Sequence, residues 1–143
     1  MKIGDLACAV QCPVETIRYY EREGLLPEPG RTGGNYRCYG VEHVARLRFV
    51  RNCRALDMTH EEIRSLIGMM DQPGVGCTSV NQLLDEHIEH VDERISELRE
   101  LKRQLARLRE SCKVEKSVDG CGILHGLAAM ETTRKGRRST HLG

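Results

Sequence analysis

The sequence has few large apolar side chains with which to fill an interior. Among its 143 residues there is one Phe and no Trp. This scarcity favours a thin helical assembly over the bulky core of an enzyme. The chain also lacks a phosphate-binding glycine loop, a paired nucleophile and base, and the ligand spacing of zinc hydrolases. We therefore expect that the protein is not an enzyme.

No segment has the pattern of a signal peptide, and no apolar run is long enough to span a membrane. These absences predict a cytoplasmic protein. The chain has seven cysteines, an odd number that fits a disulfide framework poorly. In a reducing cytoplasm such thiols stay available to bind a metal ion.

The longest regular pattern runs over residues 78–111, where neither Gly nor Pro interrupts a heptad repeat. Its apolar residues alternate steps of three and four, as a seam between two helices requires. They are Val80, Leu84, Ile88, Val91, Ile95, Leu98, Leu101, Leu105 and Leu108. A helix of this length measures roughly 50 Å, too long for the rest of the chain to cover. We expect two copies to pair along it as a homodimer.

Cysteines stand at both ends of this predicted helix. Cys77 precedes it and Cys112 follows it, so one chain cannot bring both to the same ion. If two such helices pair antiparallel, Cys77 meets Cys112 of the partner subunit, and Cys121, nine residues further on, folds back across a short loop. Three thiolates suit a soft divalent ion of low coordination number. The alternative is that all three are buried or unused thiols, since Cys is among the most buried residue types.

The start of the chain has the pattern of two short helices joined by a tight turn. We expect the first over residues 3–10 and the second over residues 14–23, with Pro13 suited to its first position and Gly24 to its end. The second helix is polar. Its outward-facing residues are expected to be Glu15, Thr16, Arg18, Tyr19 and Arg22. This pattern is typical of a helix-turn-helix whose second helix enters a DNA major groove. Taken alone, it fits a helical hairpin of any small protein equally well.

A hairpin is predicted next, because Gly33 and Gly34 separate two short polar strands at about residues 31–32 and 36–39. Its side chains Arg31, Asn35, Tyr36 and Arg37 are typical of a wing that lies against a phosphate backbone. Two amphipathic helices are expected after it, over residues 41–55 and 59–69, the second opened by a capping box of Thr59 and Glu62.

The charge is unevenly distributed, although the net charge is only +1. Between Arg31 and Arg54 there are six arginines and a single acid, Glu42. A local basic field of this kind favours a polyanionic partner such as double-stranded DNA. The other interpretation is a solvated face without a partner.

Several ordered motifs occur together in the first 75 residues. They are Thr16-Ile17-Arg18-Tyr19-Tyr20-Glu21 with Gly24-Leu25-Leu26, Arg31 with Gly34-Asn35-Tyr36-Arg37 and Tyr39, and Arg54-Ala55-Leu56-Asp57-Met58 with Glu62-Ile63. Together they resemble the MerR family of metal-responsive transcriptional regulators. The fold class expected is mainly α, a winged helix-turn-helix DNA-binding domain followed by a long antiparallel coiled-coil dimerisation helix. The domains expected are residues 1–75 for DNA binding, 76–112 for dimerisation, 113–128 as a metal-binding loop and short helix, and 129–143 as a disordered basic tail.

The resemblance also implies a mechanism. Such regulators sit as dimers on promoters whose two polymerase elements are too far apart, and they repress without inducer. On binding metal they bend and untwist the DNA so that RNA polymerase can open it. Carried over by similarity, Thr16, Arg18 and Tyr19 would contact the operator, while Tyr36 and Arg37 would grip phosphates from the wing.

Within the family, the cysteine pattern distinguishes the sensors of different metal ions. Sensors of monovalent copper, silver and gold resemble this chain but lack a thiol at the position of Cys77, so its presence here favours a divalent ion. Zinc sensors usually carry a further cysteine where this chain has Lys113. The contexts of residues 121–124 and 84–91 look most like the lead- and cadmium-responsive members. We rank Pb(II) first and Cd(II) close behind, with Hg(II) and Zn(II) lower.

Two further expectations concern histidines and the type of protein. His87 and His90 share one helical face, and cadmium regulators similar to this chain can place a second metal site there; the other interpretation is two solvated polar residues. A different functional class also stays open, namely a metal-sequestering dimer with no regulatory role.

Overall fold

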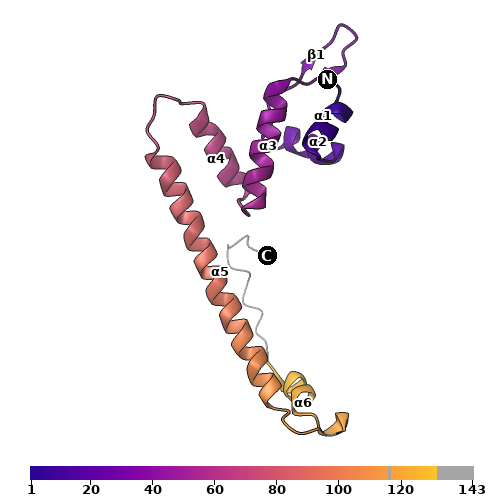
Figure 1. Cartoon of the computed structure of the whole chain (residues 1–143), viewed down its shortest axis with the longest axis vertical. Coiled ribbons are helices and arrows are strands. Elements are labelled where there is room, and N and C mark those ends of the chain that lie inside the picture. Colours follow the sequence, from indigo (N-terminus) through magenta and orange to yellow (C-terminus); the bar gives the residue numbers. More distant parts are fainter. Residues whose placement is uncertain (116, 132–143) are drawn as a thin grey trace. The chain divides into compact units, whose positions relative to one another are not determined.

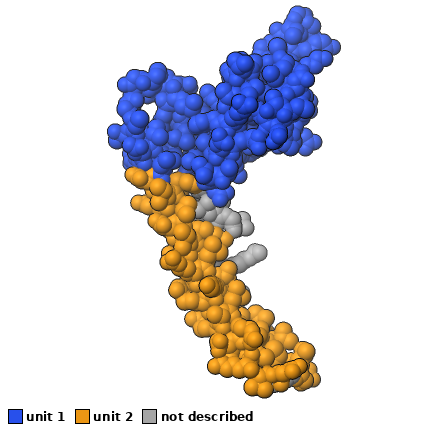
Figure 2. Space-filling view, viewed as in Figure 1, with its two compact units in different colours: residues 1–84 blue, residues 85–143 orange. Residues whose placement is uncertain are grey.

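The computed structural model describes residues 1–115 and 117–131. The chain divides into two compact units, Met1–Leu84 and Asp85–Gly143, coloured blue and orange in Figure 2. Of the tail predicted over residues 129–143, positions 132–143 lie outside the described residues.

Ahead of the longest helix, whose first residues it includes, the first unit holds four helices and a two-stranded hairpin (Figure 1). In chain order they are α1 (Ile3–Val10), α2 (Val14–Arg22), β1 (Gly30–Arg31), β2 (Arg37–Cys38), α3 (Val41–Ala55) and α4 (His60–Met70). The predicted bounds of α1 and α3 are confirmed, and those of α2 and α4 are confirmed to within one residue. Gly24, just after α2, has φ +73°, the left-handed conformation expected where a glycine ends a helix.

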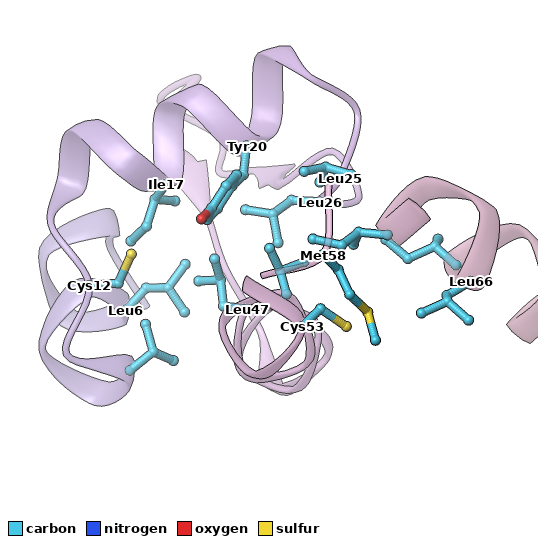
Figure 3. Close-up of a cluster of buried hydrophobic side chains, with 14 of the residues drawn as sticks. Leu6, Cys12, Ile17, Tyr20, Leu25, Leu26, Leu47, Cys53, Met58 and Leu66 are labelled. Carbon is cyan, nitrogen blue, oxygen red and sulfur yellow. The ribbon is translucent and has the colours of Figure 1, made fainter. Parts of the chain in front are cut away.

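The core of this unit is built from medium-sized side chains, as the composition requires. Leu6 of α1, Ile17 of α2 and Leu47 of α3 are fully buried and meet where these three helices pack (Figure 3). Tyr20 and Tyr39 supply the largest buried rings, and Phe49 is only partly buried. The helices are therefore held by a compact Leu, Ile and Val cluster into which few bulky residues enter.

The hairpin is a short antiparallel pair in which Gly30 faces Cys38 and Arg31 faces Arg37. Its turn was expected to depend on Gly33 and Gly34, but the left-handed residue is Asn35, with φ +63°. Asn adopts this conformation more readily than most residues. The Asn35 N–H donates to the Thr32 carbonyl at 2.8 Å and closes the turn.

Helix α4 begins with the predicted capping box. The Thr59 hydroxyl accepts from the Glu62 backbone N–H at 3.1 Å, and Glu62 Oε1 accepts from the Thr59 N–H at 3.0 Å. Two helix-end donors are thereby satisfied.

The longest element is α5 (Thr78–Glu110), one uninterrupted helix of 33 residues. A short 3-10 turn, η1 (Val118–Gly120), and helix α6 (Gly122–Ala129) follow it. Along α5 the predicted apolar stripe is largely exposed in the single chain, with Leu98 at 47% and Leu105 at 58%. Among the described residues, none of the helices combines the length and apolar character needed to cross a bilayer.

Candidate DNA-binding surface and metal centre

Helix α2 exposes the side chains that were predicted to read DNA, though not equally. Arg18 and Tyr19 are exposed, whereas Thr16 is half-buried and its hydroxyl hydrogen-bonds the Cys12 sulfur. Because both Arg18 and Tyr19 project from one short helix, they are available to a groove. Thr16 also stabilises the turn between α1 and α2.

Tyr19 has contacts with two other side chains, His60 and Arg22. Its hydroxyl lies 3.2 Å from Nδ1 of His60, the first residue of α4, and the two rings are 5.4 Å apart. The Arg22 guanidinium lies over the Tyr19 ring, 5.9 Å from its centroid. A side chain fixed in this way loses less conformational freedom on binding. His60 has a lowered pKa, chiefly because it is partly desolvated and also because Arg54 and Arg64 are near.

The wing presents Tyr36 at its tip, where the side chain is 74% exposed. Behind it, the Arg31 guanidinium donates to the Asn35 carbonyl at 3.2 Å, which braces the turn. The wing therefore offers an exposed phenol and a guanidinium with donors left over, groups that bind phosphate oxygens.

The second wing strand is tied to α2 by Glu21. Glu21 Oε2 lies 3.0 Å from the Arg37 guanidinium, and Glu21 Oε1 accepts a hydrogen bond from the Tyr39 hydroxyl. Burial and the adjoining Glu21 carboxylate raise the pKa of Tyr39 to about 12, so the phenol stays a donor at any physiological pH. Arg37, predicted to bind phosphate, is thus also a partner of α2.

The arginines of α3 divide into two roles. Arg48 is exposed and Arg46 half-buried. Arg51 donates to the carbonyl of Val10 at the end of α1, and Arg54 donates to the Met58 carbonyl at 2.7 Å. The arginines predicted to form a basic surface are therefore present. Two of them also donate to backbone carbonyls at a helix end and in a turn of the unit.

In the second unit, the residues around Cys112 and Cys121 are brought close to one another. A β-carbon added at Gly122 would stand 2.2 Å from the Ser111 carbonyl oxygen, so the backbone beside Cys121 lies against the backbone beside Cys112. Both thiols are half-buried, and Cys112 Sγ donates weakly to the Val114 carbonyl at 3.8 Å. A loop closed in this way can present two sulfurs to one ion.

The seven cysteines, all within the described residues, are free thiols. Burial raises the pKa of the Cys12 and Cys53 thiols, which disfavours the thiolate that a metal requires. Cys77 differs from them, because it is exposed and directly precedes α5. The three thiols predicted as ligands are accessible or half-accessible, and the core thiols are not.

Comparison with known proteins agrees with this architecture. A family model described as MerR HTH family regulatory protein matches residues 1–69, and one described as MerR, DNA binding matches residues 44–108. The chain belongs to the MerR family. The expectations of a mainly α fold with a helix-turn-helix, a small wing and a long helix are thereby confirmed.

Three relatives of this MerR-family chain are similar over most of their length. The transcription regulator PbrR691 from Ralstonia metallidurans CH34, solved in complex with lead(II), shares 50% identity with a TM-score of 0.81, covering 89% of this chain and 98% of that one. A ZntR homolog from Haemophilus influenzae is 50% identical over 77% of this chain and 82% of its own. The mercuric resistance operon regulatory protein of Bacillus cereus is 37% identical over 88% and 96%. All three are regulators, which confirms that the chain is not an enzyme.

The predicted second metal site of this MerR-family protein lies on α5. The rings of His87 and His90 meet edge to face, with centroids 6.4 Å apart, so the two side chains are neighbours as their spacing predicts. A metal site there stays a prediction.

Three residues important to these surfaces in the MerR-family chain were not found by sequence reasoning. Glu21 could have been suspected, because an acid within a helix predicted to contact DNA needs a partner. His60 and Gly122 give no such signal, since their contacts depend on how distant segments fold together.

Proposed function

We propose that this chain is a metal-sensing transcriptional regulator that binds promoter DNA as a homodimer. In this proposal Thr16, Arg18 and Tyr19 contact the operator, and Arg31, Tyr36 and Arg37 bind its phosphates.

The metal is held by Cys77 of one subunit with Cys112 and Cys121 of the other. Its binding activates heavy-metal resistance genes by distorting the promoter so that RNA polymerase can open it.

The contact between Gly122 and Ser111 is the observation that carries the metal site. It brings together the two backbone segments that present Cys112 and Cys121, both half-buried thiols. Sulfur donors on a short loop fit a soft ion better than Mg²⁺ or Ca²⁺, which prefer oxygen ligands. When bound, the ion would supply a crosslink between the loop and Cys77 at the start of a helix.

Dimer formation is supported by the apolar stripe of α5. Side chains such as Ile88, Leu98 and Leu105 are between 47% and 58% exposed in the single chain, and they recur at heptad spacing. An apolar stripe of this length calls for a second helix. Antiparallel pairing is proposed because it places Cys77 beside the partner's loop.

Lead(II) is proposed as the preferred ion, with Cd(II) next and Hg(II) and Zn(II) after them. The lead(II)-bound relative supports this order, because its identity of 50% extends over 98% of its chain. The similarity to the ZntR homolog and to the mercuric resistance regulator keeps zinc and mercury as alternatives. Three thiolates without a fourth strong ligand favour a large soft ion over zinc, which prefers four.

Regulation requires that the dimer has two states with different affinities for metal. Metal binding at the helix ends would favour one relative orientation of the two DNA-binding domains, by an amount set by that difference in affinity. The operator would then be bent and untwisted, at an energy that depends on its sequence.

The proposal is tested by competitive titration of the reduced protein with Pb(II), Cd(II), Hg(II) and Zn(II). Metal binding is measured by thiolate-to-metal absorption. We expect Pb(II) to displace Zn(II), and Cys77→Ser, Cys112→Ser and Cys121→Ser each to abolish the band. Undiminished binding by Cys77→Ser would refute the shared site.

Operator binding is tested with Arg18→Ala, which should abolish it and leave metal affinity unchanged. A parent protein that binds metal but no promoter DNA would be a sequestering dimer instead.

A further inference from the structure

Glu21 is an acidic residue in the helix that faces DNA, yet its side chain is only 13% exposed. Each of its carboxylate oxygens has a partner from the second wing strand or the residue just after it. Oε2 lies 3.0 Å from the Arg37 guanidinium, and Oε1 accepts from the Tyr39 hydroxyl. One side chain thus joins two residues that are 16 and 18 positions away in sequence.

Tyr39 is a fixed anchor for this arrangement. It is 2% exposed, and its ring meets the His43 ring edge to face at 5.1 Å. His43 itself accepts from the Gly40 N–H at 3.0 Å and contacts the Pro27 carbonyl at 3.2 Å. Because Tyr39 cannot move without disturbing the core, Glu21 is held at a defined place and so is any group bound to it.

Arg37 is the exposed member of this arrangement. Its side chain is 45% exposed, and a guanidinium has five N–H donors in a rigid plane. Glu21 engages one terminal nitrogen, which leaves donors on the remaining nitrogens for a phosphate oxygen. The pair therefore restrains the guanidinium at one nitrogen while part of it faces outward.

We propose that Glu21 is a positioning residue for DNA recognition, which sets the wing against α2 and orients Arg37 toward the phosphate backbone. This inference rests on the proposed function, since it deepens the role of the same surface. In this role Glu21 fixes the position of Arg37 and of the wing, although its negative charge repels the DNA phosphates.

The two effects of Glu21 have opposite signs, which makes the inference testable. A carboxylate near phosphates repels them, so removing its charge alone should strengthen binding to every DNA sequence. Removing a positioning contact should instead weaken binding to the operator, because Arg37 must then be ordered at the moment of binding.

The experiment compares the parent with Glu21→Gln on two duplexes, one selected by the parent from a random-sequence pool and one of unselected sequence. We expect affinity for both duplexes to fall about three- to tenfold, because the phosphates that Arg37 would contact are common to every sequence. Equal or tighter binding to the selected duplex overturns the proposal.

Glu15→Gln is the matched control, because Glu15 is an exposed acid on the same helix. It should raise affinity slightly for both duplexes. A parent that selects no sequence at all would refute the proposed function and the role of Glu21 with it, whereas a selected duplex that Glu21→Gln binds normally refutes the role of Glu21 alone.

A double-mutant cycle with Arg37→Met tests whether Glu21 affects DNA binding through Arg37. If Glu21 acts through Arg37, Glu21→Gln should cost at most about half as much operator affinity, on a logarithmic scale, in the Arg37→Met protein as in the parent. An equal cost in both backgrounds overturns the orienting role of Glu21. Thermal unfolding of each variant identifies the temperature range in which all of them are folded, and affinities are compared there.

Discussion

The backbone at Gly122 lies against the carbonyl group of Ser111, so closely that a β-carbon at position 122 would stand 2.2 Å from the oxygen. Side chains never approach a backbone atom to this distance, so only glycine fits without movement. The contact closes the loop between α5 and α6 and brings the neighbours Cys112 and Cys121 toward each other. Gly122 therefore acts on the candidate metal centre although it has no side chain.

Gly122→Ala should weaken metal binding. The methyl group must push the start of α6 away from Ser111 and so separate the two thiols. We expect metal affinity to fall about tenfold or more, the range found for residues that support metal ligands. Isothermal competition against a chelator measures it, with operator affinity of the metal-free protein as the check that the first unit is intact.

Gly126→Ala is the control for this substitution. Its β-carbon would meet only Cδ2 of Leu108 at 3.2 Å, the end of a flexible side chain that can move aside. Metal affinity should stay within about twofold of the parent. If both variants lose affinity equally, the packing of α6 as a whole matters and the Ser111 contact has no special role.

The pKa of His60 predicts a loss of stability in mild acid. Partial burial, Arg54 and Arg64 lower this pKa, and Glu23 raises it less. The unfolded chain therefore takes up a proton at His60 near the ordinary pKa of about 6.5, while the folded chain takes it up only at lower pH. Between these two values stability falls as pH falls, and above about 6.5 His60 contributes no pH dependence.

Thermal unfolding at pH 7.5 and 5.5 measures this effect in the parent and in His60→Gln. Gln at this position can still accept from Tyr19 but does not titrate. We expect the melting temperature of the parent to drop more than that of the variant over this interval. Equal drops would show that other groups account for the acid sensitivity.

The helices could be predicted from sequence because their ends carry local signals. Pro13 and Gly24 bracket α2, and Thr59 with Glu62 opens α4, as the structure has them. These signals act within one helical turn, so no knowledge of the tertiary fold is needed. The heptad repeat likewise defined α5 to within one residue.

The contacts between distant segments could not be predicted. Tyr19 and His60 are 41 positions apart, and nothing in either neighbourhood indicates the other. The hydrogen bond from the Tyr39 hydroxyl to Glu21 forms only once the wing has folded onto α2. Asn35 took the left-handed position in the wing because asparagine tolerates it, although two glycines stood beside it. The DNA contacts and the metal ligands stay predictions.

Gln11→Gly should stabilise the first unit. Gln11 ends α1 with φ +50° and ψ +49°, a left-handed conformation that costs a residue with a β-carbon about 1 kcal/mol or more. Glycine removes that cost but increases the freedom of the unfolded chain, so we expect a net gain of about 0.5–1 kcal/mol. Urea unfolding measures it. Gln11→Ala keeps the β-carbon and should change stability little; an equal gain in Gln11→Ala would contradict the conformational explanation.

Leu98→Glu should dissociate the proposed dimer, because Leu98 lies in the middle of the apolar stripe of α5 and is 47% exposed in the single chain. Two copies of the charge would be placed in the seam, where an unpaired carboxylate is costly. We expect the dissociation constant to rise at least about a hundredfold, as measured by sedimentation equilibrium. Metal absorption should be lost with the dimer, since Cys77 then has no partner loop to reach.

Gln104→Glu supplies the comparison for that experiment, because Gln104 is an exposed polar residue of the same helix and lies outside the heptad stripe. It adds the same charge at the helix surface and should leave the dimer and the metal band intact. A Leu98→Glu protein that remains dimeric would mean that α5 pairs through another face. A monomer that still binds metal with the parent's absorption would instead place all the ligands in one chain, and the shared site would be wrong.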